Sequence, residues 1–331
     1  MTAGRRAGAG PSGDAAVICG LGYWLPPDVV TNADLCAHFD TSEEWITRRT
    51  GIRTRRVAGP GLSTSDMAVE AGARALRSAD GPGAQAVVLA TTTPDRTCPA
   101  TAPEVASRLG LTGAAAFDVA AVCTGFLYAL ATASGFITAG IADRVLVIAA
   151  ERFTTLLDPL DRATAPIFGD GAGAVVLRRG SAREQGAIGR TVLASDGDGD
   201  RRDLIRVEEG YFRMEGRTVF RQAVERMTEA GRAAAGAAGW SMDTVDRLVV
   251  HQANARVSAA VASEFGITGE RHAQNIADIG NTAAASIPIL LAQSTEDHTI
   301  EAGHRVLITG FGGGLTWGAT TVVWPQLKVV A

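Results

Sequence analysis

Short apolar runs alternate with segments of helical periodicity along this chain, and the alternation occurs twice. Short runs rich in β-branched residues predict buried strands, whereas apolar residues spaced three to four apart predict helices. The first set begins with a strand at Ala86–Thr91, a helix at Ala102–Leu109 and a second helix that begins at Cys123. It continues with a strand at Arg144–Ala149, a glycine-rich turn at Phe168–Ala174 and a last strand at Val175–Leu177.

The second set repeats this order in the C-terminal part of the chain. Strands that alternate with helices predict a largely parallel sheet with helices packed on its faces. We therefore predict an α/β fold built from two copies of one α/β unit. The second set begins with a strand at Arg247–Val250 and two helices at Asn254–Phe265 and Thr282–Gln293. It continues with a strand at Arg305–Thr309, a glycine-rich turn at Phe311–Gly318 and a last strand at Ala319–Val323.

The duplication divides the chain into an N-terminal half, residues 15–180, and a C-terminal half, residues 181–331. Residues 1–14 are rich in Gly, Ala and Pro, and we expect them to form a disordered tail. The Arg5–Arg6 pair is not followed by the apolar segment of an export signal. A cytoplasmic location is therefore the default expectation.

Composition removes several classes of protein from consideration. The chain has 331 residues, of which 46% are hydrophobic, and a formal net charge of -4. That is enough apolar material for a large core. The mild acidity gives no reason to expect nucleic acid or an anionic membrane surface as a partner. No run reaches the roughly 20 apolar residues that a membrane-spanning helix needs.

Cysteine and lysine narrow the chemistry further. The four cysteines are widely spread without a CxxC pair, which argues against a disulfide framework and a zinc site. Lys328 is the only lysine, and it lies near the C-terminus. A Walker-type phosphate loop and the Schiff-base enzymes each need an internal lysine, so these classes are excluded.

The glycine-rich turns could be mistaken for a nucleotide-binding loop. Gly169, Gly171 and Gly173 have the spacing of part of a dinucleotide fingerprint. That fingerprint must connect a strand to a helix. Both turns here run instead into β-branched strand sequence, so the nucleotide interpretation receives little weight.

Cys123 is the first candidate for chemistry. It precedes the apolar helical stretch Leu127–Thr138. At a helix N-terminus, unpaired backbone N–H groups and the helix dipole favour the thiolate. The same N–H groups could bind the oxyanion of a thioester under attack. A buried structural cysteine at the start of a core helix explains the position equally well.

His251 and Asn281 are weaker candidates when each is taken alone. His251 ends an apolar strand, which is where reactive groups gather in α/β sheets, although a structural histidine is the simpler explanation. Asn281 precedes a helix, and an asparagine there is usually an N-cap. The duplication changes this balance, because Cys123 and Asn281 begin corresponding helices and would converge on one central site. Nucleophilic thiol chemistry then becomes the better explanation.

These residues belong to motifs that resemble the thiolase-like condensing enzymes, and specifically bacterial β-ketoacyl-[acyl-carrier-protein] synthase III. The resemblance runs from about Val17 to Val323. It implies a thiolase-like fold with duplicated halves in a layered αβαβα arrangement. The motifs that carry it are Asp40–Arg53, Phe117–Phe126, Asp158–Arg162, Phe168–Ala174, His251–Asn254, Gly280–Thr282 and Phe311–Gly314.

The resemblance implies a catalytic triad of Cys123, His251 and Asn281. Cys123 would accept an acyl group from an acyl-CoA. His251 and Asn281 would then donate hydrogen bonds to a malonyl thioester on acyl carrier protein as it loses carbon dioxide. The resulting carbanion would attack the acyl group, whose oxyanion would rest on the backbone N–H groups of Cys123 and Gly313. The family requires no metal or cofactor and forms homodimers.

The same resemblance implies roles in binding. It assigns CoA contacts to Trp45, Arg49, Arg162 and Asn254. It assigns carrier-protein docking to Arg221 and Arg256, with Arg221 at a position where lysine is usual. Phe168, Phe311 and Cys98 are assigned to the acyl pocket. Without the resemblance, Trp45 would be read as an apolar helix position and the arginines as parts of a solvated surface.

Two departures from the family pattern bear on the substrate. Cys98 stands where acetyl-specific relatives carry a phenylalanine that blocks the acyl pocket of the partner subunit. We therefore expect an acyl primer that is longer than acetyl or branched. Ser195–Met214, in the region that lines the acyl pocket, looks short for the family and rich in charge. Both departures favour priming of a polyketide or other secondary pathway over ordinary fatty-acid initiation.

Two other functions stay open at this point. An acyltransferase of the same fold would pass the acyl group from Cys123 to a hydroxyl or amine without decarboxylation, although Asn281 argues against it. A non-catalytic subunit would bind acyl-CoA or carrier protein, but such proteins typically lose the nucleophile or the histidine. This chain has Cys123, His251 and Asn281.

Overall fold

The computed structural model describes residues 14–330, and its two large sheets share one plan. The first has the strand order β1-β7-β6-β4-β5 and the second the order β12-β11-β13-β14-β8. The strands of the first sheet are β1 (Asp14–Trp24), β4 (Ala86–Ala90), β5 (Ala115–Val119), β6 (Arg144–Glu151) and β7 (Gly171–Ser181). Those of the second are β8 (Val192–Ser195), β11 (Arg247–Val250), β12 (His272–Ala273), β13 (Arg305–Gly312) and β14 (Thr316–Val323).

Corresponding strands pair in the same sense in the two sheets. β4 is parallel to β5 and β6, as β11 is to β12 and β13. β7 is antiparallel to β6 and β1, as β14 is to β13 and β8. The duplicated α/β fold is therefore confirmed, but each sheet is mixed where we predicted largely parallel strands. The segments that join β6 to β7 and β13 to β14 contain no α-helix, so they provide no parallel crossover.

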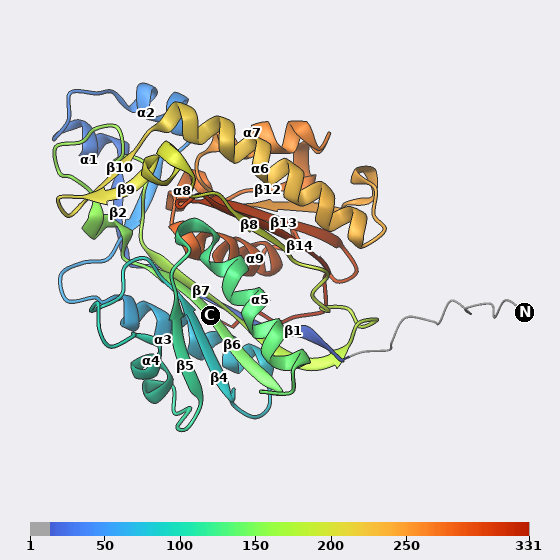
Figure 1. Ribbon diagram of the computed structural model, residues 1–331. Helices are drawn as coiled ribbons and strands as arrows, with labels where there is room; N and C mark the ends of the chain where they lie inside the picture. Colours follow the sequence, from blue (N-terminus) through green and yellow to red (C-terminus); the bar gives the residue numbers. More distant parts are fainter. Residues whose placement is uncertain (1–13, 331) are drawn as a thin grey trace, which may run out of the picture.

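Helices and sheets form five layers (Figure 1). Two helices, α5 and α9, lie between the sheets, α3 and α4 cover the outer face of the first sheet, and α6 and α7 cover that of the second. This is the αβαβα arrangement that the resemblance implied. The bounds are α3 (Thr64–Ala79), α4 (Ala102–Arg108), α5 (Gly125–Thr138), α6 (Gly216–Ala237), α7 (Ala255–Glu264) and α9 (Ser286–Glu296).

The glycine-rich segments serve close packing more than turning. Gly171 and Gly173 lie inside β7, not in a turn before it, and only Gly313 to Leu315 separate β13 from β14. A Cβ atom on Gly173 would lie 2.7 Å from the backbone nitrogen of Ile289 in α9. Glycine therefore allows the first sheet to contact the central helix of the second half.

Both central helices begin with a 3₁₀ turn that the sequence did not reveal. The turn η1 (Val122–Thr124) precedes α5, and η6 (Ala283–Ala285) precedes α9. Val122 and Ala283 each open their turn with a positive φ of 46°. Cys123 therefore corresponds to Ala284, and Asn281 lies before η6. The expectation that Cys123 and Asn281 occupy corresponding helix starts is wrong by this offset.

Smaller elements complete the fold around one end of the sheets. One group is the hairpin of β2 (Asp28–Thr31) and β3 (Thr54–Val57), with α1 (Asn32–Cys36) and α2 (Glu43–Thr50) inserted between its strands. Another is the hairpin of β9 (Ile205–Glu208) and β10 (Tyr211–Met214). A short helix, α8 (Ile276–Ile279), leads towards η6.

The ends of the chain add little to this picture. Of the predicted tail, residues 1–13 lie outside the described residues, and Asp14 already belongs to β1. None of the helices described between residues 14 and 330 has the length and apolar character needed to cross a membrane.

Candidate active site

A cavity of about 630 Å³ is lined by residues from both halves. It brings together most of the residues that the sequence singled out. Gly313, Arg221 and Cys98 are not among the described residues that line it. Those that line it are Cys123, His251, Asn281, Trp45, Arg49, Arg162, Asn254, Arg256, Phe168 and Phe311.

The cavity is basic where it meets solvent and buried at its other end. Exposed arginines from three helices and a loop contribute to its lining: Arg49, Arg162, Arg217 and Arg256. Cys123, His251 and Asn281 are all buried. This arrangement suits a long anionic molecule whose reactive end reaches the buried residues.

Cys123 is held in a strained turn at the end of β5. Val122, the residue before it, has left-handed backbone geometry that β-branched residues rarely adopt. On the opposite side, a Cβ atom on Gly312 would lie 2.9 Å from the backbone nitrogen of Cys123. The end of β13 thus approaches the backbone of η1 closely, and the positions of both segments are fixed.

Burial makes the neutral thiol the resting form of Cys123. The side chain is only 8% exposed, and burial raises the pKa of the thiol far above its usual range. The negative charge of Glu151 raises this pKa further, whereas the backbone N–H of Cys123 lowers it by a smaller amount. The expected shift towards the thiolate is therefore wrong, because desolvation outweighs the helix terminus.

Glu151 is a buried carboxyl group that the sequence analysis missed. It ends β6, where its Oε2 accepts hydrogen bonds of 3.0 Å from the backbone N–H of Thr92 and the hydroxyl of Thr93. Burial raises the pKa of Glu151 to about 7. At neutral pH this group is therefore partly protonated, which limits the negative charge near Cys123.

His251 follows β11 and is 2% exposed. Burial lowers the pKa of its imidazole to about 3, so the ring is neutral at physiological pH. Its Nδ1 lies 2.7 Å from the hydroxyl oxygen of Ser286, and that oxygen also accepts the backbone N–H of Gln252 at 3.3 Å. Among the described residues, Ser286 has no other hydrogen-bond acceptor for its hydroxyl proton. The hydroxyl therefore donates to Nδ1, and Nε2 carries the ring proton.

Asn281 is oriented by the start of the next turn. Its Oδ1 accepts the backbone N–H of Ala283 at 2.8 Å, which assigns the other amide atom as nitrogen. That nitrogen, Nδ2, makes only a long contact of 3.4 Å with the carbonyl oxygen of Ala253. This bond to the second residue along is an Asx turn and not the expected N-cap, because the N-cap of η6 is Thr282. It leaves N–H groups that can donate to a ligand in the cavity.

Two backbone hydrogen bonds tie Asn281 to the first half. The N–H of Asn281 donates to the carbonyl oxygen of Ile167 at 2.9 Å, and the N–H of Gly169 donates to that of Asn281 at 3.0 Å. Phe168, between these two residues, forms a parallel bridge with Asn281 and lines the cavity. A thiol and two neutral N–H donors therefore share one cavity, an arrangement that can support attack on a thioester and stabilise an oxyanion or enolate.

The predicted CoA-binding residues occupy the outer part of the cavity. Trp45 and Arg49 lie together on α2, with the guanidinium 5.8 Å from the indole ring centre. Arg162 donates a 2.6 Å hydrogen bond to the carbonyl oxygen of Asp40. Asn254 caps α7 through a 3.0 Å bond from the N–H of Val257 to its Oδ1. Arg256 lies in the first turn of α7 and is exposed.

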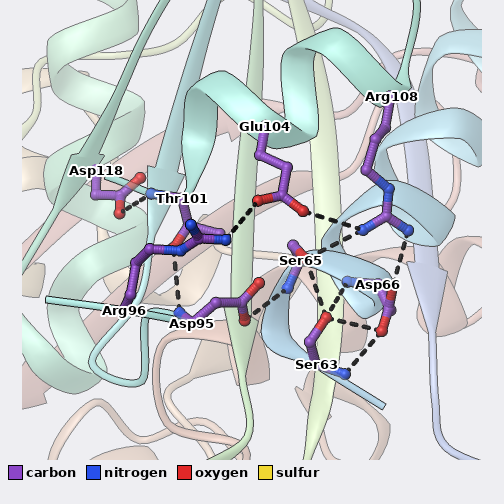
Figure 2. A network of polar contacts seen from close by, with 9 residues as sticks. All are labelled: Ser63, Ser65, Asp66, Asp95, Arg96, Thr101, Glu104, Arg108 and Asp118. Carbon is purple, nitrogen blue, oxygen red and sulfur yellow. Dashed lines mark hydrogen bonds and ion pairs between the residues drawn. The ribbon is translucent and has the colours of Figure 1, made fainter. Parts of the chain in front are cut away.

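Cys98 is exposed. It lies in the loop between Asp95 and Thr101, two residues that are held by hydrogen bonds (Figure 2). After the loop, the carboxylate of Asp118 accepts the backbone N–H groups of Thr101 and Ala102, each at 2.7 Å. Before it, Asp95 accepts the N–H of Ser65 at 3.2 Å. Cys98 does not line the cavity of its own chain.

The β9–β10 hairpin forms one wall of the cavity. The sequence assigned its segment to the acyl pocket but did not predict the hairpin. Ile205, Phe212 and Met214 come from the charged segment 195–214 and line the cavity. Phe212 packs edge-on against Phe168 and Phe153, with ring centres 5.0 and 5.1 Å apart. The one sequence signal for the hairpin is Gly210 between two short strands, where a positive φ of 83° is needed.

No group of three or more His, Cys, Asp or Glu side chains in the described part of the chain is arranged to hold a metal ion. The donors in the cavity are instead backbone and side-chain N–H groups together with the arginines of the mouth.

The chain matches two family models, described as 3-oxoacyl-[acyl-carrier-protein (ACP)] synthase III over residues 117–197 and its C-terminal region over residues 235–324. Beta-ketoacyl-[acyl-carrier-protein] synthase III 2 of Streptomyces coelicolor is 51% identical, over 100% of this chain and 98% of that protein. The Pseudomonas aeruginosa protein named beta-ketoacyl-[acyl-carrier-protein] synthase III is 48% identical, over 95% of this chain and 98% of its own length.

Solved structures agree with these matches. The crystal structure of 3-oxoacyl-(acyl carrier protein) synthase III from Pseudomonas aeruginosa superposes with a TM-score of 0.92 at 48% identity, covering 95% of this chain and 99% of the other. The priming β-ketosynthase from the R1128 polyketide biosynthetic pathway superposes with a TM-score of 0.89 at 32% identity, covering 98% and 100%.

The contact between Ser286 and His251 generates a testable prediction. In Ser286→Ala, Nδ1 loses its donor, so we expect His251 to populate both neutral tautomers where the unmodified protein holds one. Selective ¹⁵N labelling of the five histidines and measurement of the imidazole nitrogen shifts would detect this. The loss of one buried hydrogen bond should also lower the free energy of unfolding by about 1 kcal/mol.

Ser294→Ala is the matched control, because Ser294 is buried on the same helix and makes no hydrogen bond to His251. It should leave the imidazole shifts of His251 unchanged. Identical His251 shifts in the unmodified protein and in Ser286→Ala would contradict the assigned tautomer.

Proposed function

Because the chain belongs to the β-ketoacyl-[acyl-carrier-protein] synthase III family of condensing acyltransferases, we propose that Cys123, His251 and Asn281 carry out its decarboxylative condensation. The observation that carries this assignment is the pairing of a buried thiol with two neutral N–H donors in one cavity. Each donor is oriented by its own partner, since Ser286 fixes His251 and Ala283 fixes Asn281.

The first half-reaction loads Cys123. Its sulfur attacks the thioester carbonyl of an acyl-CoA, and the CoA sulfur leaves with the proton of the Cys123 thiol. The carbonyl oxygen becomes an oxyanion, which the backbone N–H groups of Cys123 and Gly313 would bind. The close approach of Gly312 to the backbone of η1 supports this, because it brings the β13–β14 turn beside Cys123.

The second half-reaction consumes malonyl-acyl carrier protein. As the carboxylate leaves as carbon dioxide, its bonding electrons pass into an enolate, whose oxygen accepts hydrogen bonds from Nε2–H of His251 and Nδ2–H of Asn281. The carbanion then attacks the acyl carbonyl and forms a carbon–carbon bond. Cys123 leaves as the thiolate and takes up one proton from solvent, which its raised pKa favours. Neutral donors suit the enolate because they do not neutralise the malonyl carboxylate in advance.

Substrate binding follows the polarity of the cavity. Trp45 and Arg49 would stack on and pair with the CoA nucleotide, and Arg162 and Asn254 would contact it from the other side of the mouth. Arg221 and Arg256 would attract the acidic carrier protein. The exposure of these arginines and the basic character of the mouth support both roles. Acyl-CoA and malonyl carrier protein are substrates, and no step needs a metal or cofactor.

We further propose a homodimer in the cytoplasm, where acyl-CoA is available. β5 is the last strand of the first sheet, and within the described chain its outer edge has no paired strand. In a dimer, Cys98 would enter the cavity of the partner subunit. Its small side chain would leave room there for a primer longer than acetyl, or a branched one.

Two competing functions receive less support. A transferase that passes the acyl group to an alcohol or amine needs no enolate stabilisation, so it does not explain the orientation of Asn281. A binding subunit does not explain a buried nucleophile beside two fixed donors. Initiation of fatty-acid synthesis and priming of a polyketide both use the proposed chemistry, and the identity of the primer would separate them.

The division of labour within the triad can be tested by mutation. Cys123→Ala should abolish acylation. Asn281→Ala should still accept the acyl group but should form β-ketoacyl product about 100-fold more slowly, because an enolate donor is lost. Single-turnover measurements of both half-reactions by mass spectrometry would separate these effects.

Asn275→Ala is the matched control, because Asn275 lies outside the cavity and bonds to Gln293. It should retain both rates. Equal losses of acylation and condensation in Asn281→Ala would count against the proposed enolate role. Transfer of the acyl group from Cys123 to an alcohol at the full rate would favour the transferase alternative.

The role of Cys98 predicts a change of primer preference. Cys98→Phe should shift the ratio of kcat/KM values towards acetyl-CoA by about tenfold or more relative to longer or branched acyl-CoAs, because a larger side chain would fill the pocket. Cys98→Ser keeps the volume small and should leave the preference unchanged. A clear preference for acetyl-CoA in the unmodified enzyme, with no change in Cys98→Phe, would disprove this part of the proposal.

A further inference from the structure

Arg55 is a fully buried arginine behind the cavity wall. It lies on β3 and is 1% exposed. No carboxylate of the described residues forms an ion pair with it. Its guanidinium instead donates to three neutral oxygens: the carbonyl of Pro166 at 2.8 Å, Oδ1 of Asn32 at 2.9 Å and the carbonyl of Val30 at 3.2 Å. Because a charge is costly to bury without an ion pair, the buried guanidinium of Arg55 indicates a specific structural role.

The contact with Pro166 leads directly to the site. Pro166, Ile167 and Phe168 are consecutive residues that line the cavity. The carbonyl oxygen of Ile167, one residue beyond the carbonyl that Arg55 binds, accepts the backbone N–H of Asn281. The guanidinium therefore fixes one end of the segment whose other end pairs with Asn281.

The aliphatic stem of Arg55 packs against both sides of the same pairing. A Cβ atom on Gly169 would lie 3.3 Å from the Cβ of Arg55, and one on Gly280 would lie 3.0 Å from it. These glycines flank Phe168 and Asn281 in the sequence. Arg55 thus supports the bridge between the two halves with its stem as well as its head.

The remaining contacts do not involve Cys123. Asn32 extends the network towards α2, because its Nδ2 donates to Thr47 at 3.1 Å and to the carbonyl of Ile52 at 2.8 Å. None of the hydrogen bonds made by Arg55 goes to η1 or α5, which hold the nucleophile. The network therefore reaches Asn281 through Pro166 and, through Asn32, the helix α2, but it does not reach the elements that hold Cys123.

We propose that Arg55 is a positioning residue for Asn281, and that it serves the condensation step and not the acylation of Cys123. This inference rests on the proposed role of Asn281. The guanidinium is suited to the task because its planar fork holds three oxygens in fixed directions, which a lysine ammonium on a flexible chain does not.

The test is Arg55→Lys in the full-length protein, with each half-reaction measured separately. We expect acylation of Cys123 to stay within about threefold of the unmodified rate, and condensation of the pre-acylated enzyme with malonyl carrier protein to fall about tenfold or more. Arg56→Lys is the matched control, because Arg56 is the next residue and donates to the carbonyl oxygens of Pro26 and Pro27, away from the site. It should change neither rate.

Asn281→Ala provides the reference for a condensation-selective loss. If Asn281→Ala shows that selectivity and Arg55→Lys slows both steps equally, or neither, the role assigned to Arg55 is overturned while the proposed function stands. If Asn281→Ala itself is not selective, the proposed function and this inference both fail.

A second variant covers the case in which Arg55→Lys does not fold. Asn32→Ala removes one of the three acceptors and leaves Arg55 in place. Because Asn32 also bonds to α2, which carries Trp45 and Arg49, acylation is measured at saturating acyl-CoA. We expect this variant to slow condensation about threefold or more, with the acylation rate at saturation unchanged. Unchanged condensation in a folded Asn32→Ala variant would overturn the inference.

Discussion

The backbone pairing of Phe168 with Asn281 is the contact on which the site depends. Two hydrogen bonds, of 2.9 and 3.0 Å, join the segment before β7 to the turn before α9. Each half of the molecule contributes different chemistry, a thiol in the first and two N–H donors in the second. The proposed mechanism needs both, so it requires the relative position of the halves to be fixed to within a fraction of an ångström.

Several buried groups maintain that position and set the electrostatics of the cavity. Arg55 supports the pairing from behind, and Gly173 lets the first sheet approach α9. Desolvation keeps His251 neutral and Cys123 protonated. The buried end of the cavity therefore offers oriented dipoles and little net charge, whereas the positive charge is placed at the mouth. Such a site stabilises negative charge that develops in a transition state more than it binds an anion in the ground state.

The sequence predicted the features that repeat or that carry a recognisable motif. Two rounds of the same strand and helix pattern predicted the duplicated fold, and the convergence of Cys123, His251 and Asn281 on one place followed from it. Strands were predicted at Val175–Leu177 and Ala319–Val323, but their antiparallel direction was missed, and their glycine-rich beginnings were read as turns. The direction of the Cys123 pKa shift was wrong because a local pattern contains the helix terminus but not the depth of burial.

Other parts of the site had no local signal in the sequence. Ser286 and Arg55 are ordinary members of a helix and a strand until the fold places them beside His251 and Pro166. Their importance arises from contacts with residues 35 and 111 positions away in the chain. A pattern of periodicity and spacing does not contain such contacts, and only the folded chain reveals them.

The most direct test of the account is intact-protein mass spectrometry of the enzyme incubated with a panel of acyl-CoAs and then with malonyl carrier protein. The account predicts one acyl adduct, absent in Cys123→Ala, that disappears as a β-ketoacyl carrier protein and carbon dioxide form. The mass of the adduct would also name the primer. An adduct that malonyl carrier protein cannot discharge, or the absence of any adduct, would contradict the claim that this cavity carries out a decarboxylative condensation.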